Sequence, residues 1–118
     1  MGDNSWWVMR AAALAVCLAL PALPGAAADA YVKITAPGNG AKLDGMELTK
    51  LAYEVRPGPK GDHVHVYIDG KEVGILRQLK GNYTLESLAP GDRTLCVKVV
   101  NKGHVPIGVE QCVKVRVE

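Results

Sequence analysis

The sequence predicts an all-β domain, a two-layer sandwich of seven strands stapled by one disulfide. Residues after position 30 show no helical period, and short stretches of alternating apolar and polar residues are separated by turn residues. Seven strands at this spacing in about 90 residues are typical of an immunoglobulin-like or fibronectin type III-like sandwich. The predicted strands are 31–35, 47–55, 63–69, 72–79, 83–88, 93–101 and 109–117.

The first 28 residues have the pattern of a secretory signal peptide. A polar start ending at Arg10 is followed by an apolar run over 11–20 and then by small residues, which predicts cleavage after Ala28 or after Ala30. The apolar run is shorter than the roughly 20 residues of a membrane span, so we expect no span after cleavage. We expect Cys17 to be removed with this segment and residues 29–118 to form the mature domain.

The alternation within the strands assigns their faces. In a β-strand successive side chains point to opposite sides of the sheet, so one set of alternate residues forms the core. The outer face of the third strand then carries His63 and His65, and the outer face of the last two strands carries Cys96 and Cys112. The predicted core residues are Leu51, Tyr53, Val55, Val64, Val66, Ile68, Leu95, Val97, Val99, Val113, Val115 and Val117.

Two cysteines remain after processing, and an even pair in an exported chain indicates a disulfide. A hairpin register centred on residue 104 places Cys96 opposite Cys112, where the two side chains are close enough to bond. Closing a loop of this length stabilises the fold by ~3 kcal/mol in the entropic model. The chain has no C-x-x-C motif, which argues against a redox-active dithiol.

The composition excludes several functions. The 14 basic and 12 acidic residues give a net charge of +2 without a basic cluster, so we expect no nucleic-acid partner. Ser87 is the only serine after the leader, and the topology places it at the end of the sandwich opposite the histidines, so no Ser/His/Asp arrangement can form. No phosphate-binding glycine motif and no free cysteine remain in the mature chain. We therefore expect a protein that is not an enzyme.

The three histidines are the candidate binding residues. His63 and His65 point to the same face of one strand, and the loop that carries His104 lies at the same end of such a sandwich, together with Asp62. Imidazole and carboxylate ligands favour Zn(II) or Cu(II). The alternative is a solvated strand face with a turn-capping loop histidine. Because these residues are expected to be exposed, His63→Ala or His104→Ala should each lower metal affinity by an order of magnitude or more, with little change in stability.

Four stretches resemble a family of small exported bacterial domains of uncharacterised activity. They are DHVHVYIDG (62–70), LAPGDRTLCVKVV (88–100), GHVP (103–106) and CVKVRV (112–117). The resemblance implies an immunoglobulin-like sandwich in the bacterial periplasm and selects the same three histidines. The sequence departs from the family at Val64 and Arg93, where the family tends to have histidine.

Two functional hypotheses follow from these features. The first is a non-enzymatic periplasmic or secreted module that binds a ligand or a protein partner, for example by adding a partner's strand to an exposed sheet edge. The second is a small periplasmic protein that binds Cu(II) or Zn(II) through His63, His65 and His104, with Asp62 as a further candidate ligand.

Overall fold

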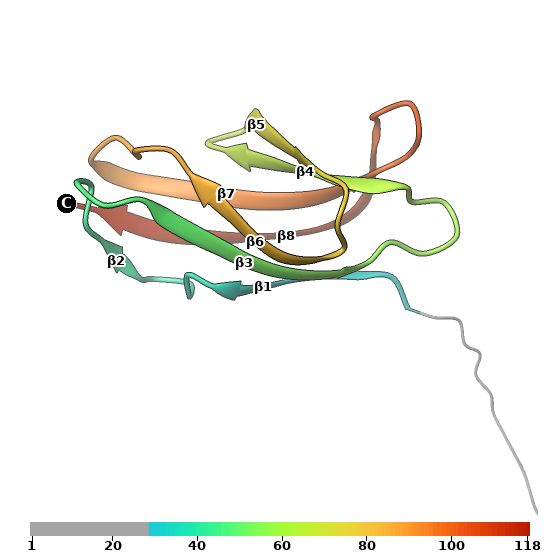
Figure 1. The fold of residues 1–118 in the computed structure, drawn as a ribbon, viewed down its shortest axis with the longest axis horizontal. Helices are drawn as coiled ribbons and strands as arrows, with labels where there is room; N and C mark the ends of the chain where they lie inside the picture. Colours follow the sequence, from blue (N-terminus) through green and yellow to red (C-terminus); the bar gives the residue numbers. More distant parts are fainter. Residues whose placement is uncertain (1–28) are drawn as a thin grey trace, which may run out of the picture.

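The structure, a computed structural model, describes residues 29–118. The predicted signal peptide, residues 1–28 with Cys17, lies outside the described residues, so its cleavage stays a prediction. The described part contains eight strands and no α-helix (Figure 1). They are β1 (Tyr31–Ala36), β2 (Lys42–Leu43), β3 (Thr49–Arg56), β4 (His63–Ile68), β5 (Lys71–Leu76), β6 (Lys80–Leu85), β7 (Gly91–Val100) and β8 (Pro106–Val117).

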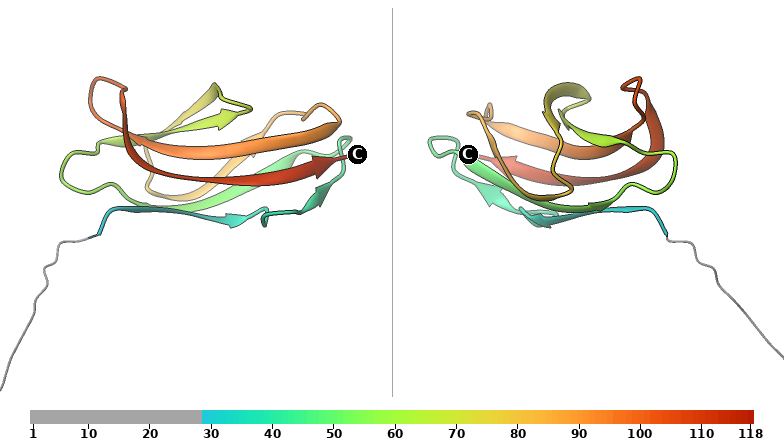
Figure 2. Two further views of the ribbon diagram at one scale, coloured as in Figure 1. Left: turned by 180° about the vertical axis from the view of Figure 1, so that it is seen from behind. Right: turned by 45° about the vertical axis from the view of Figure 1, so that its right-hand side comes forward.

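The strands form two sheets that pack face to face. One sheet has the order β1–β3–β6 and the other the order β2–β8–β7–β4–β5. Figures 1 and 2 show the two layers from three sides. Strand pairs are antiparallel except β2–β8, which is parallel. The predicted sandwich is confirmed, with its seven strands present and the two-residue β2 added at the edge beside β8.

The core lies between the sheets and follows the predicted strand parity. Leu51, Val66 and Val97 have no exposed surface, whereas Ile68 is only partly buried because it lies at the end of β4. Valine dominates the core, and its β-branched side chain packs well on a pleated surface. The remaining predicted core residues are all buried, namely Tyr53, Val55, Val64, Leu95, Val99, Val113, Val115 and Val117.

The β7–β8 hairpin carries the predicted disulfide. Cys96 lies directly opposite Cys112 in the register, with the two Cα atoms 4.0 Å apart, and their sulfur atoms are bonded. The sequence separation of 16 residues spans the whole turn of the hairpin. The prediction is confirmed, and the covalent bond ties together the two longest strands of the sheet. A disulfide of this kind is typical of proteins in oxidising compartments.

The β4–β5 turn has the geometry expected for its sequence. Asp69 and Gly70 both have positive φ, at 51° and 85°, as a two-residue hairpin turn requires. The Asp69 carboxylate accepts hydrogen bonds from the backbone N–H of Thr94 and from the Arg93 guanidinium, each at 2.9 Å. These bonds tie the turn to β7.

Among residues 29–118, no helix is long and apolar enough to cross a bilayer.

Candidate metal centre

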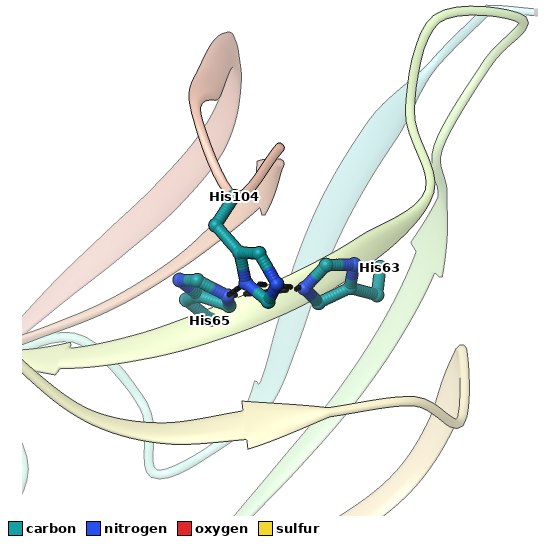
Figure 3. A group of neighbouring side chains, drawn as sticks. All are labelled: His63, His65 and His104. Carbon is teal, nitrogen blue, oxygen red and sulfur yellow. Dashed lines mark hydrogen bonds between the residues drawn. The ribbon is translucent and has the colours of Figure 1, made fainter. Parts of the chain in front are cut away.

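Two loops at one end of the sandwich bring together all three histidines of the chain. The β3–β4 loop (57–62) leads into β4, which carries His63 and His65, and the β7–β8 loop (101–105) carries His104. Both loops lie at the same end of the molecule in Figures 1 and 2. Figure 3 shows the three rings facing one another, with His104 reaching over the strand from its loop.

The β3–β4 loop is shaped by a glycine just before the site. A Cβ added to Gly61 would lie 2.5 Å from a Val99 methyl and 2.6 Å from the Pro57 carbonyl oxygen. Only glycine therefore lets the loop pass this close to its own start and to β7. The next residue, Asp62, donates its backbone N–H to the Val100 carbonyl at 2.8 Å, so the chain joins the sheet immediately before the first histidine.

One nitrogen from each ring contributes to a compact triangle. His63 Nε2 lies 3.1 Å from His65 Nε2 and 3.2 Å from His104 Nδ1, and His65 Nε2 lies 3.1 Å from His104 Nδ1. Within the described residues, these are the three side chains whose potential ligand atoms gather in one group, all within 4.8 Å. The arrangement is a tripod of three imidazole nitrogens, drawn from two elements that are about 40 residues apart in the chain.

The burial of the strand histidines differs from the expectation. His63 and His65 are each only 1% exposed, whereas His104 is exposed. The outer face of a sandwich sheet usually faces solvent, but here the β7–β8 loop folds back over β4 and places the His104 ring 4.7 Å from the His63 ring, centre to centre. The expectation of an exposed pair is therefore wrong, and with it the reason for expecting that His63→Ala changes stability little; His104 is exposed, as that expectation requires.

Asp62 lies on the far side of the His63 ring from the triangle. Its Oδ2 atom is 2.8 Å from His63 Nδ1, which donates a hydrogen bond to it. This hydrogen bond is the main reason why the pKa of Asp62 lies below its usual value. Arg77 Nη1 lies 3.7 Å from the same oxygen. In this position Asp62 orients His63, because a proton held on Nδ1 leaves the lone pair of Nε2 directed into the triangle.

Glu72 occupies a similar position at His65. Its Oε1 atom lies 3.2 Å from His65 Nδ1, close enough for an ion pair. The two atoms lack the alignment of a hydrogen bond, and this nitrogen is buried without another hydrogen-bond partner. We treat the contact as electrostatic, because the N–O distance alone does not make a hydrogen bond. Burial lowers the pKa of His65, and the Glu72 charge opposes that shift.

The triangle contains fewer protons than nitrogen–nitrogen contacts. A neutral imidazole carries one N–H, and His63 donates its N–H to Asp62, so His63 Nε2 brings a lone pair to the triangle. His65 and His104 then supply at most two protons for three nitrogen–nitrogen contacts of 3.1–3.2 Å. A cation at the centre would instead be attracted by all three lone pairs at once.

The triangle has the size that a transition-metal ion requires. An ion placed 2.0–2.1 Å from each nitrogen would lie about 1 Å above their plane, with N–metal–N angles of about 100°. This angle is close to the tetrahedral value, and three protein ligands leave at least one position for water or another ligand. The two carboxylates behind the rings, Asp62 and Glu72, would balance the charge of a divalent ion.

Sequence reasoning did not single out Glu72. The β4–β5 register shifts between Val66 and Tyr67, and this irregularity brings Glu72 opposite Tyr67 and beside His65. The Asp69–Gly70 turn predicts a hairpin, and this was the one signal in the sequence that the strand with Glu72 lies beside the strand with His65. A bulge inside a strand leaves no comparable mark in the alternation of apolar and polar residues.

Comparisons with known proteins define the fold. No protein-family model matches the sequence, and no curated protein matches it. Among solved structures, the chain is similar to fibronectin(III)-like modules of CbhA from Clostridium thermocellum, with 23% identity and a TM-score of 0.63 over 74% of this chain and 96% of that one. This similarity supports the immunoglobulin-like or fibronectin type III-like sandwich.

Two further structures share the sandwich at lower similarity. One is the CARDB domain of a Pyrococcus furiosus protein in complex with di-metal ions, with 16% identity and a TM-score of 0.54 over 76% of this chain and 88% of that one. The other is an FMN-binding β-glucuronidase from Faecalibacterium prausnitzii, with 23% identity and a TM-score of 0.55, which covers 78% of this chain but 12% of that one. At these identities the likeness establishes the fold.

Proposed function

We propose that this chain is an exported, non-enzymatic binding module whose ligand is a divalent transition-metal ion, Zn(II) or Cu(II). The observation that carries the proposal is the triangle of three imidazole nitrogens with sides of 3.1–3.2 Å. Its ligand set suits both ions, and Cu(II) binds more tightly in the intrinsic order of affinities. The predicted signal peptide and the disulfide support export, where a site made of histidines stays available to metal ions.

The support for a metal goes beyond the proximity of the rings. Carboxylates behind metal-binding histidines fix the ring tautomer and raise the basicity of the ligand nitrogen. Asp62 stands in that relation to His63 through a hydrogen bond, and Glu72 places a negative charge beside His65 Nδ1. A CARDB domain with a similar sandwich has been solved with di-metal ions, so a fold of this kind can carry a metal site.

Equilibrium titration of the mature chain tests the proposal. Residues 29–118, prepared without a histidine tag, should bind one Zn(II) or Cu(II) ion per chain with a saturable isotherm. The chain has three histidines in total, and all of them belong to the triangle, so no stray imidazole competes. His104→Ala should lower the affinity at least tenfold, because one of three ligands is lost.

Val105→Ala is the matched control for the ligand variant. Val105 is the next residue in the same loop, its side chain is 56% exposed, and it offers no ligand atom. This variant should bind metal as the wild type does. Equal affinities for wild type and His104→Ala would contradict the proposal.

A second candidate function, binding of an extended segment of a partner protein, is supported by β5. This strand is an edge of the five-stranded sheet, and Val73 and Ile75 on it are 40% and 47% exposed. The Tyr83 hydroxyl donates to the Val73 carbonyl at 3.1 Å, and a strand edge with exposed apolar side chains can accept another strand by hydrogen bonding through its remaining main-chain groups. Cross-linking should then capture the same partner protein with wild type and with His104→Ala. The Val73→Glu and Ile75→Glu variants should not bind this protein. Retention by both edge variants would contradict this role.

A further inference from the structure

The β7–β8 loop is closed by hydrogen bonds to one residue, Asn101. Asn101 Oδ1 accepts a hydrogen bond from the backbone N–H of Gly103 at 2.8 Å and another from Val105 at 3.1 Å. The backbone of Asn101 adds two bonds, since its carbonyl accepts from His104 N–H at 2.9 Å and its N–H donates to the Val105 carbonyl at 3.0 Å. Four hydrogen bonds therefore converge on a loop of five residues.

This loop holds His104 in an unusual backbone conformation. Its φ is +66°, in the left-handed region that residues with a side chain rarely adopt. Such a conformation persists where the surrounding structure determines it, and the bonds to Asn101 join the residues on both sides of His104. The same conformation places Nδ1 of an exposed loop residue within 3.2 Å of two buried rings.

We propose that Asn101 is a positioning residue that sets the metal affinity of the three-histidine site by holding His104 in its coordinating conformation. The inference rests on the proposed metal-binding function. His63 and His65 are fixed by the strand, whereas His104 is an exposed loop residue whose place depends on the loop. When the loop is already closed, the metal does not have to order it on binding, so the affinity is higher.

The alternative is that Asn101 only closes the hairpin. In that case its removal lowers the stability of the metal-free fold and leaves the affinity of the folded protein unchanged. The two roles separate in a double-mutant cycle, because a residue that acts through His104 has no effect on metal binding once His104 is gone.

The experiment is a Zn(II) titration of four variants of residues 29–118, with thermal unfolding of each metal-free protein. Asn101→Ala should lower the Zn(II) affinity about tenfold, which is the typical effect of removing a residue that orients a metal ligand. Asn101→Asp keeps the acceptor oxygen that both backbone N–H groups use, so its affinity should equal or exceed that of wild type. His104→Gly removes the ligand and suits the positive φ, and adding Asn101→Ala to it should change the affinity less than about twofold.

The outcomes distinguish the inference from the function on which it rests. No saturable binding by wild type overturns the proposed function. If Zn(II) binding requires His104 but its affinity is unchanged in Asn101→Ala, the inference alone is overturned. The inference is also overturned if Asn101→Ala lowers the Zn(II) affinity equally in wild type and in the His104→Gly variant.

A measurement on the wild type covers the case in which Asn101→Ala does not fold. Nuclear Overhauser contacts between the His104 ring and the His63 or His65 ring should be present without metal, because the closed loop already holds the three rings together. Their appearance only after Zn(II) is added would overturn the inference.

Discussion

The residues behind the histidines should affect metal affinity unequally. Asp62 makes a hydrogen bond of 2.8 Å to His63 Nδ1, whereas Glu72 lies 3.2 Å from His65 Nδ1 without hydrogen-bond alignment. The Asp62 side chain is also less exposed, at 31% against 46% for Glu72. The structure thus predicts that Asp62→Ala weakens metal binding more than Glu72→Ala.

The size of each effect follows from these contacts. Loss of a hydrogen-bonded carboxylate behind a metal-binding histidine costs about 10–100-fold in affinity, and we expect this range for Asp62→Ala. Asp62→Asn retains an acceptor oxygen and loses the charge, so its effect should be smaller. Glu72→Ala removes a partly screened charge without an aligned hydrogen bond, and we expect less than about fivefold.

Competition with a chromogenic chelator at neutral pH measures these affinities, with Zn(II) as the ion. Arg77→Ala is the matched control, because Arg77 is 68% exposed and touches Asp62 at 3.7 Å without reaching a ring. Its affinity should stay within about twofold of wild type. Equal effects of the two carboxylate variants, or the reverse order, would refute the assignment of Asp62 as the main support of His63.

Three further predictions concern the fold. Replacing Cys96 and Cys112 together by alanine should lower the unfolding free energy in urea by about 3 kcal/mol, since their separation is 16 residues; an unchanged midpoint would contradict this. Asp69 accepts hydrogen bonds from the backbone of β7 and, with a smaller effect, from Arg93, and these bonds hold the pKa of Asp69 below its usual value. The ionised Asp69 therefore stabilises the fold fully above its unfolded pKa of about 4. This stabilisation is lost as the pH falls through the lower pKa of the folded state. Asp69→Asn should therefore reduce the acid dependence of the melting temperature, and a profile identical to wild type would argue against it. Gly61→Ala should destabilise by about 1–3 kcal/mol in the same urea assay, because its Cβ would lie 2.6 Å from a backbone oxygen, and a neutral result would show that the loop can move aside.

Much of the fold could be predicted because it depends on strand period and turn chemistry. The alternation around Leu51 and Val97 identifies the core, and the Asp69–Gly70 pair identifies a hairpin turn. The cysteine pairing follows from the same parity, because a register centred on residue 104 places Cys96 opposite Cys112. The two-residue β2 was missed, since a strand of this length has no measurable period.

The candidate site could be predicted in its members but not in its environment. Strand parity and sandwich topology bring His63, His65 and His104 to one end. Their burial could not be predicted, because it depends on the path of the β7–β8 loop over β4. That path in turn depends on hydrogen bonds made by Asn101, which the sequence presents only as one more polar residue in a turn.

The most direct test of the three-histidine site is nitrogen-15 NMR of the histidine rings, with residues 29–118 titrated with Zn(II). The account predicts that all three rings shift together up to one ion per chain, with coordination through Nε2 of His63 and His65 and through Nδ1 of His104. Independent and non-saturating shifts at each histidine, or coordination through the opposite nitrogens, would contradict it.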